Sequence, residues 1–515
     1  MTEPQLTDNP DWTDGYFTDA PYPQRYYREL NPNALRFSVA GNAFVAADLS
    51  RPFTYMELGF GRGLSLAVNA AANPQGRFYG IDFMPEHVAD VAGLGRAAKL
   101  NNLDVRPLSF ADLASQDYPD FDFVTLHGVW SWISAENRAH IMAFLDRKLK
   151  SSGTVYVSYN AMPGWLAMLP LRELMKAEFD RTPGTVEQRV TTAISYAEAM
   201  RDAKAHFFEA NAKAASRLNG IKAKPPAYLA HEYFNADWHA FYFADVVRDL
   251  APLGLSFCGS AHVASNMDVL QVPANARVMV GRAHDTIERE TLKDFFVSRQ
   301  FRRDVFVRAP RPMDRADFAR QFGVLSVARL VTSARYETLS LTAPAGKFAA
   351  LTPHHRAIIA ALGDGPMTVN QLAARPDVAG TFVPGGDTAE SAVYLLIAMG
   401  AVDIAADPPQ RHAAIEPCRS LNRVLQANLK LEHHVLASPV LGGAVTVAEV
   451  DFTHLVAKAQ GGREKLYDVL ARRGRHLYKD DVPVPETIAR AKLAAKYDEF
   501  AVGALPVYEA LGIAD

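Results

Sequence analysis

The sequence predicts an α/β protein whose core is an open, doubly wound sheet. Over residues 53–160, short apolar runs alternate with amphipathic segments, which is typical of parallel strands joined by right-handed helical crossovers. A glycine-rich loop follows the first apolar run, and acidic residues end or follow the next two. Ligands of such sheets bind outside the carboxyl ends of the strands, so we expect a site at these loops.

The elements of the sheet follow from the apolar runs and the segments between them. Strands are expected at residues 53–60, 77–82, 104–108, 122–129 and 153–160, and helices at 64–72, 85–102 and 135–150. A helix and then a strand over 241–261 could add to the same sheet. Residues 185–218 have the pattern of one long inserted helix, begun by a capping box of Thr185 and Gln188 and ended by Gly220.

We divide the chain into five regions. The first holds the glycine-rich loop and the sheet with an N-terminal lid, and the second is the helical insertion. The third is a regulatory or middle region that could complete the sheet. The fourth has the order of helices and strand of a winged helix, and the fifth shows no motif. Their bounds are 1–180, 181–235, 236–345, 346–410 and 411–515.

Composition and charge exclude several classes of protein. The net charge of −3 gives no positive field that would draw the chain to nucleic acid or an anionic membrane. Cys258 and Cys418 form no C-x-x-C pair, and we expect neither disulfides nor a metal site. The acidic N-terminus lacks the features of a signal peptide, and Asn160 and Pro163 interrupt the uncharged run 151–171. We therefore expect a cytoplasmic protein without a membrane span.

The loop after the first strand reads E-x-G-x-G-x-G, from Glu57 through Gly59 and Gly61 to Gly63. A dinucleotide fingerprint would need its third glycine one position later, where the chain has Leu64. Glycine lets the backbone turn sharply and lets a ligand approach it closely. The carboxylate of Glu57 would repel a phosphate but favour an ammonium or sulfonium group. A glycine turn that binds no ligand is the alternative.

This loop resembles motif I of the class I S-adenosylmethionine-dependent methyltransferases. Asp82 ends the second strand, where an acidic side chain takes the ribose hydroxyls. Asp112 resembles the residue that accepts the adenine amino group, and Phe110 lies beside it. The resemblance implies S-adenosyl-L-methionine as the cofactor. The residues that it assigns to the cofactor are Glu57, Gly59, Gly61, Gly63, Asp82, Phe83, Ala111, Asp112, Leu113 and His127.

Residues after the fourth and fifth strands are the candidates for the catalytic site. They are His127, Trp130, Tyr159 and Asn160, and Trp132 and Trp165 are further candidates for an aromatic lining. Aromatic faces would hold a sulfonium or a methylated ammonium by cation–π contact, and Asn160 would orient the acceptor. His127 could act as a base, or it could pack against the cofactor or hydrogen-bond within its loop. The aromatic residues could equally belong to the core.

The resemblance extends further along the chain. The stretches HGVWSWI, YNAMPGW, FYFADV and FRRDVFVR are similar to those of bacterial methyltransferases that carry a methyltransferase regulatory domain. That group includes protein lysine methyltransferases of outer-membrane proteins. The resemblance implies methyl transfer to a protein side chain, with lysine as the favoured acceptor. A small-molecule O- or N-methyltransferase and a non-catalytic protein that binds S-adenosylmethionine are the alternatives.

The remaining regions give further expectations. Residues 376–410 contain no Lys, Arg or His, so the winged-helix-like region should contact protein rather than DNA. The basic run 298–311 is interpreted as a solvated face, or else as a surface for an acidic partner. We expect the chain beyond residue 300 to select the substrate, so that a chain ending near residue 285 would still bind the cofactor.

The N-terminal segment is rich in aromatic residues, which are rare in disordered tails. We expect it to pack as a lid over the cofactor or on the edge of the sheet. Its aromatic residues are Trp12, Tyr16, Phe17, Tyr22, Tyr26 and Tyr27.

Overall fold

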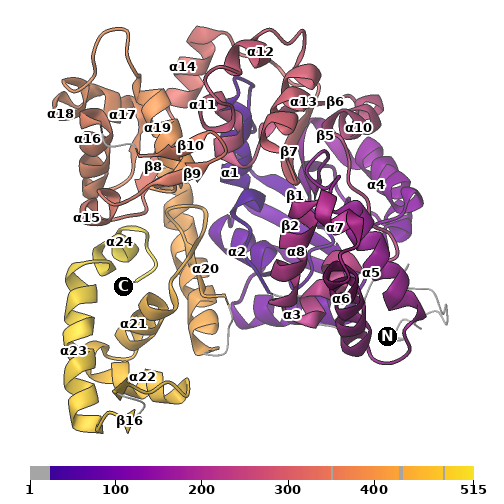
Figure 1. Cartoon of the computed structure of the whole chain (residues 1–515). Helices are drawn as coiled ribbons and strands as arrows, with labels where there is room; N and C mark the ends of the chain where they lie inside the picture. Colours follow the sequence, from indigo (N-terminus) through magenta and orange to yellow (C-terminus); the bar gives the residue numbers. More distant parts are fainter. Residues whose placement is uncertain (1–23, 350–351, 429–432, 480–481, 515) are drawn as a thin grey trace.

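The computed structural model describes residues 24–349, 352–428, 433–479 and 482–514. A seven-stranded sheet with the order β3-β2-β1-β4-β5-β7-β6 forms the core, which confirms the predicted α/β fold class. In Figure 1 the sheet lies in the middle, a group of helices projects at the lower right, and the C-terminal part forms the left of the molecule.

All strands of this sheet run in one direction except β7, which is antiparallel to both of its neighbours. The five strands expected from residues 53–160 are present, and the strand expected within 241–261 joins the same sheet as β6. The bounds are β1 (Phe53–Leu58), β2 (Gly76–Asp82), β3 (Leu103–Pro107), β4 (Phe121–Leu126), β5 (Leu149–Asn160), β6 (Leu255–Ser260) and β7 (Phe301–Arg308).

Successive side chains of a strand point to opposite faces of the sheet. Here the side chains on both faces are apolar, and helices cover both faces. Tyr55 and Phe123 pack against one group of helices, and Met56 and Val124 against the other. The first group is α1 (Pro32–Gly41), α2 (Leu64–Ala72) and α3 (Pro85–Ala97). The second group is α4 (Ala135–Lys148) and α10 (Phe243–Leu250), with α13 (Thr286–Val297) packed against α10.

The basic run 298–311 is not a solvated face, and this prediction was wrong. It contains β7, an internal strand between β5 and β6 in which Val305 and Phe306 are fully buried. The guanidinium of Arg302 is also buried, and it pairs with Asp304 at 2.7 Å and with Asp294 at 2.8 Å. The expected cut near residue 285 would therefore remove β7 and leave β6 without its neighbour in the sheet.

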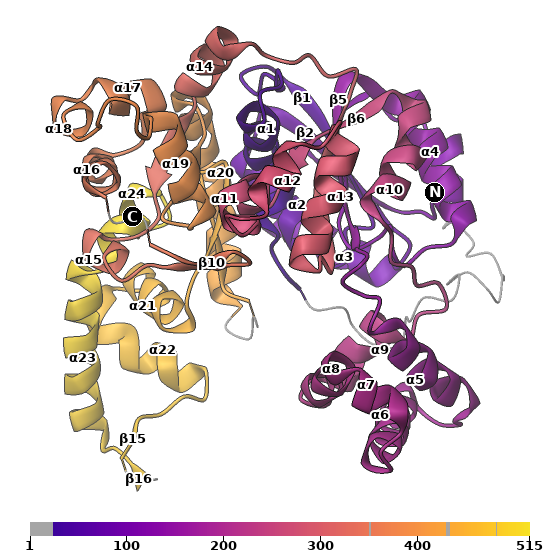
Figure 2. The same ribbon diagram turned by 45° about the horizontal axis from the view of Figure 1, so that its top comes forward.

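The helical insertion is a bundle rather than one long helix. The capping box of Thr185 and Gln188 is present, but the chain breaks at Lys204, which has a positive φ of 58°. A separate core holds the bundle together, with Trp165 and Phe179 among its buried residues. Figure 2 shows the bundle standing away from the C-terminal part. Its helices are α5 (Leu169–Arg181), α6 (Val186–Asp202), α7 (His206–Ala210), α8 (Ala212–Lys222) and α9 (Pro226–Tyr233).

The region around residues 346–410 combines helices with a three-stranded sheet of order β11-β8-β12. One of these strands, β8, comes from before residue 346, which the sequence did not indicate. The elements from residue 268 to 405 are α11 (Asp268–Gln271), α12 (Arg277–Gly281), α14 (Arg315–Gly323), β8 (Ser326–Arg329), α15 (Ser333–Tyr336), β9 (Leu341–Ala343), β10 (Gly346–Phe348), α16 (Pro353–Ala361), β11 (Met367–Thr368), α17 (Val369–Ala374), α18 (Pro376–Ala379), α19 (Ala389–Ala398) and β12 (Val402–Ala405).

The last part of the chain packs against the helix that follows the glycine loop. Leu64 and Val68 of α2 share one core with Leu421 and Leu436 of the C-terminal part. Its elements are α20 (Pro408–Ala427), β13 (Val435–Ser438), β14 (Gly443–Thr446), α21 (Glu449–Ala459), α22 (Leu466–Arg472), β15 (Tyr478–Lys479), β16 (Val482–Pro483), α23 (Glu486–Val502) and α24 (Leu505–Ala510). Within the described ranges, no helix has the length and apolar character that a membrane crossing needs.

The buried position of β7 gives a test by substitution. Phe306→Ala should lower the free energy of unfolding by about 3–5 kcal/mol, because the deletion leaves a cavity in the core. Phe295→Ala is the matched control, since Phe295 is 58% exposed and its loss should cost no more than about 0.5 kcal/mol. Urea unfolding followed by circular dichroism measures both. Equal, small effects would contradict the placement of β7.

Candidate active site

A cavity opens at the carboxyl ends of β1, β2 and β4. It contains about 1050 Å³ of space, counted out to its open mouth. Its lining comes from the N-terminal segment and from the loops after four strands. The lining residues are Tyr27, Glu57, Gly59, Phe60, Gly61, Asp82, Phe83, His87, Leu108, Ser109, Phe110, His127, Gly128, Val129, Trp132, Ile133 and Asn137.

The glycine loop forms the floor of this cavity. Gly59, Gly61 and Gly63 have positive φ angles of 70°, 57° and 57°, a conformation that favours glycine. A Cβ atom at Gly59 would lie 2.7 Å from Val129, and one at Gly63 would lie 2.1 Å from Val91. Gly59 and Gly61 line the cavity, whereas Gly63 caps α2 and permits close packing on α3.

Asp82 holds the loop in place. One carboxylate oxygen accepts a hydrogen bond from the backbone N–H of Gly61 at 2.7 Å. The other accepts from the N–H of Met84 at 3.0 Å and lies 3.1 Å from Nδ1 of His87. The side chain is therefore fixed at the end of β2, where Phe83 also lines the cavity.

Glu57 is the least compensated group of the site. It is 3% exposed, and its Oε2 has no hydrogen-bond partner among the described residues. Burial, and to a smaller extent the nearby charge of Asp82, raises the pKa of Glu57 to about 8. A buried carboxyl group without a partner costs free energy, and a cationic ligand in the cavity would relieve this cost.

His127 forms the wall of the cavity after β4. Its Nδ1 lies 2.9 Å from the hydroxyl of Tyr156, and its ring centroid is 3.7 Å from that of Tyr27. Burial lowers the pKa of His127 to about 4, so the imidazole is neutral near pH 7. A neutral imidazole does not repel a cation bound beside it.

The wall after β3 differs from the sequence-based assignment. Leu108, Ser109 and Phe110 line the cavity, whereas Ala111, Asp112 and Leu113 do not. Asp112 is exposed, and its carboxylate accepts hydrogen bonds from the N–H and the hydroxyl of Ser109 at 3.1 and 2.7 Å. Leu113 is buried in the core. The chain turns into a short 3-10 helix at residue 111, which carries these side chains away from the cavity.

The structure does not bring Trp130, Tyr159 or Asn160 to the cavity. Trp130 and Tyr159 are fully buried, and the hydroxyl of Tyr159 donates to Asp304 at 2.6 Å. Asn160 is also buried, and its backbone N–H donates to Ser131. The second tryptophan of HGVWSWI, Trp132, lines the cavity instead.

Two of the aromatic residues of the N-terminal segment, Tyr26 and Tyr27, lie within the described residues. Tyr27 lines the cavity, and Tyr26 contacts the C-terminal part, where its hydroxyl accepts from the N–H of Ala444 at 3.0 Å. Trp12, Tyr16, Phe17 and Tyr22 lie outside the described residues. Trp132, which was expected in the aromatic lining, does line the cavity. Sequence reasoning missed Leu108, Ser109, Ile133 and Asn137 as lining residues, although their place after β3 and β4 was a usable signal.

The cavity fits S-adenosylmethionine on its own chemistry. The unpaired carboxyl group of Glu57 suits a cation, and the fixed carboxylate of Asp82 suits two hydroxyl groups. Gly59 and Gly61 line the cavity without side chains, so a ligand can approach the backbone closely there. The apolar side chains of Leu108 and Phe110 suit the base.

Comparisons with known proteins agree with this chemistry. Residues 56–157 match the family described as a methyltransferase domain, and residues 225–308 match the predicted methyltransferase regulatory domain. An uncharacterized protein of Synechocystis, sll1526, is 31% identical over 509 residues, which cover 98% of this chain and 99% of that protein. RP028 of Rickettsia prowazekii is 26% identical over 242 residues, which cover 45% of this chain and 92% of that protein.

The fold is also that of a solved structure. PKMT2 from Rickettsia typhi in complex with AdoHcy superimposes with a TM-score of 0.70 over 96% of this chain and 99% of that chain, at 17% identity. From the matched families, the full-length Synechocystis relative and this fold, we conclude that the chain belongs to the class I S-adenosylmethionine-dependent methyltransferases with a methyltransferase regulatory domain, and that S-adenosylmethionine is its cofactor.

Proposed function

We propose that this methyltransferase acts on a protein side chain and that the acceptor is the amino group of a lysine. The observation that carries the proposal is the aromatic, uncharged mouth of the cavity. Tyr27 contributes to it from the N-terminal segment, and His127 and Trp132 contribute from the loop after β4.

Such a mouth suits an amine acceptor. Bound S-adenosylmethionine supplies an electrophilic methyl group for in-line displacement. Desolvation lowers the pKa of a lysine ammonium, so the amine loses its proton to water as it enters. The aromatic faces exclude water and attract the methylated ammonium by cation–π contact. Resemblance to protein lysine methyltransferases and the fold shared with PKMT2 support the same acceptor class.

We assign the cofactor contacts on the same basis. Glu57 would lie near the positive charge of the cofactor, and Asp82 would accept from the ribose hydroxyls. Phe110 would pack on the adenine. His127 would act by packing and by remaining neutral, since a group with a pKa of about 4 is a weak base. Trp130, Tyr159 and Asn160 would support the site from behind and would not touch the acceptor.

The function is tested with labelled S-adenosylmethionine and a cell-envelope protein fraction. We expect label on protein and, after hydrolysis, on methylated lysine. Trp132→Ala should lower turnover by about tenfold or more while cofactor affinity changes less, because a wall of the acceptor end is lost. Trp130→Ala should instead destabilise the fold by about 3–5 kcal/mol. Label only on small molecules, or on residues other than lysine, would contradict the proposal.

The glycine floor is tested by adding a side chain. Gly61→Val should abolish cofactor binding, because the new side chain points into the ligand space and blocks close approach. The substitution also strains the backbone at a φ of 57°. Gly400→Val is the matched control, since Gly400 has a φ of 70° and open space around it. Calorimetry that finds unchanged affinity in Gly61→Val would refute the site.

The pKa of Glu57 gives a prediction about protons. With a pKa of about 8, Glu57 is mostly protonated at pH 7, and a bound cation would lower this pKa. Binding should therefore release a proton at pH 7, and affinity should rise as the pH increases from 7 to about 8. Calorimetry in buffers of different ionisation enthalpy measures the release. Glu57→Gln should lose it. If the enthalpy of cofactor binding to the unsubstituted protein does not depend on the buffer, Glu57 does not release a proton on binding, and the prediction is wrong.

A further inference from the structure

A second cleft lies between α8 of the helical bundle and the turn that follows β5. It contains about 1000 Å³ of space and is open to solvent. Gly164 and Met168 of the turn line the cleft, and so does Gln300, which precedes β7. On the opposite side, α8 contributes Lys213, Ser216 and Arg217. The residues of α8 recur at helical spacing, so they form one face of that helix.

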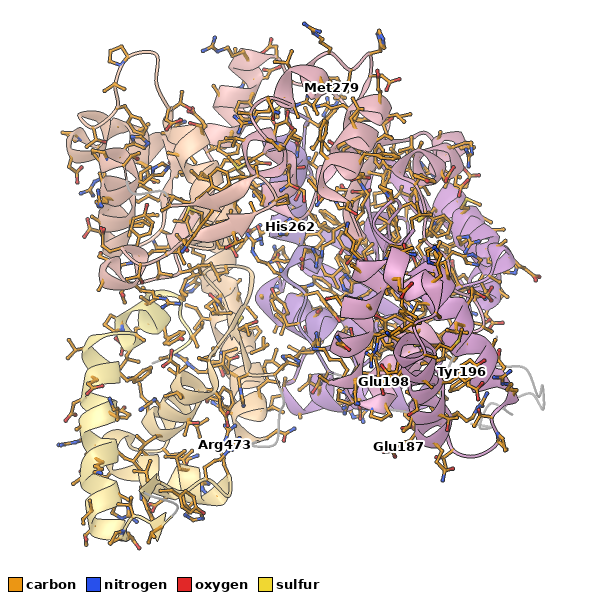
Figure 3. All side chains as sticks on the ribbon, viewed as in Figure 1. Glu187, Tyr196, Glu198, His262, Met279 and Arg473 are labelled. Carbon is orange, nitrogen blue, oxygen red and sulfur yellow. The ribbon has the colours of Figure 1, made fainter. Side chains whose placement is uncertain are left out.

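This face of α8 is basic, and no acidic side chain lines the cleft. Lys213 is exposed and takes part in no ion pair within the described ranges. The nearby acidic residue Glu198 of α6, labelled in Figure 3, is occupied by Lys222 at 3.2 Å and Arg201 at 3.8 Å. Lys213 therefore presents a positive charge that no described residue pairs with, whereas Arg217 interacts electrostatically with Glu232 of α9.

Arg217 is held in a fixed orientation. Its Nε donates to the hydroxyl of Tyr233 at 2.8 Å, and its guanidinium lies 5.6 Å from the ring centroid of Trp165. A guanidinium that is stacked and anchored loses little side-chain entropy when it binds a carboxylate. This arrangement is suited to a negatively charged group that arrives from solvent.

The cleft and the cofactor cavity both lie next to the core of the helical bundle. Trp165, which lies under Arg217, belongs to the core of the bundle, and Trp132 of the cavity packs against that core. A second connection runs through Tyr228 of α9, which interacts electrostatically with both Arg217 and Tyr27. A single chain of substrate could therefore have one side chain in the cavity while its neighbours lie in the cleft.

We propose that this cleft binds the polypeptide next to the methyl acceptor and selects a substrate with an acidic side chain there, which Lys213 and Arg217 contact. The inference rests on the proposed protein acceptor. It assigns substrate choice to the helical bundle, in addition to the chain beyond residue 300. The acidic group would contact the basic residues of the cleft. The acceptor amine would contact the aromatic residues of the cavity.

The test uses short fluorescent peptides with a central lysine. One peptide carries glutamates toward both ends, and its partner carries glutamines at the same positions. Binding to the full-length protein is followed by anisotropy in the presence of AdoHcy at low ionic strength, where charge contacts are least screened. We expect the acidic peptide to bind about tenfold more tightly, a ratio typical of one or two charge-assisted contacts.

Lys213→Glu should remove this preference and leave affinity for the glutamine peptide within about twofold. The control is Lys492→Glu, which makes the same change of net charge at an exposed residue of α23 in the C-terminal part. It should keep the preference. Equal binding of the two peptides, an unchanged preference in Lys213→Glu, or tighter binding of a single-stranded oligonucleotide than of the acidic peptide would overturn the inference.

Methyl transfer is measured on the same peptides, so the two proposals fail separately. Binding that prefers the acidic peptide, with label only on small molecules, would support the cleft and contradict the proposed acceptor. Methylation of both peptides with equal affinity and equal KM would support the acceptor and overturn the cleft.

Discussion

The burial of α2 on all sides is the constraint on which the site depends. All of its nine residues are buried, as expected for a helix that is apolar around its whole circumference. One side packs on the sheet and the other on α20 and β13 of the C-terminal part. Since Gly63 caps this helix, the position of the glycine floor is set by two regions far apart in the sequence.

Buried amides make this arrangement specific. Asn69 donates to the carbonyl of Leu30 at 3.0 Å, and Asn73 donates to the carbonyl of Gly442 at 2.9 Å. A buried amide that loses its partner costs about 1–3 kcal/mol. The N-terminal segment, which carries Tyr27 to the cavity, and the C-terminal part are thus tied to one helix. A substitution in either region would therefore affect the glycine loop by displacing α2, and not by removing a group that contacts the cofactor.

The region matched as regulatory is part of the catalytic sheet. Strand β7 places Arg302 in a fully buried cluster with Asp304, Asp294 and Glu290. The surrounding carboxylates raise the pKa of this guanidinium well above its usual value. Removing one member of such a cluster costs about 3–5 kcal/mol, because a buried charge is left without a partner. Since Tyr159 also donates to Asp304, the cluster fixes the carboxyl end of β5.

The sequence was sufficient for the sheet and for the part of the site that lies on strands. Glu57, Gly59, Asp82 and His127 were predicted to be near the ligand, and they line the cavity because parallel strands end at one edge. Side chains in the loops were not predictable at the level of single residues. Trp130 and Trp132 have the same chemistry, and only the turn of the backbone decides which one reaches the cavity.

The interpretation of β7 failed for a different reason. Its basic residues are normally read as solvated, because an isolated charge is rarely buried. The partners that make burial possible, Asp294 and Glu290, come from α13. Such pairing depends on tertiary structure, and no local pattern indicates it.

The electrostatics of the cavity agree with a charge-conserving transfer. Burial raises the pKa of Glu57 and lowers that of His127, so near pH 7 both groups are held close to neutrality. In the proposed reaction, a methyl group and a positive charge pass together from the cationic cofactor to a neutral amine, so no net charge is created or lost in a region of low dielectric constant. Glu57 can ionise when the sulfonium arrives, whereas the aromatic mouth needs no ionisation to hold the charge once it has moved to nitrogen. The site can therefore stabilise the charge at both ends of the transfer without a strong base.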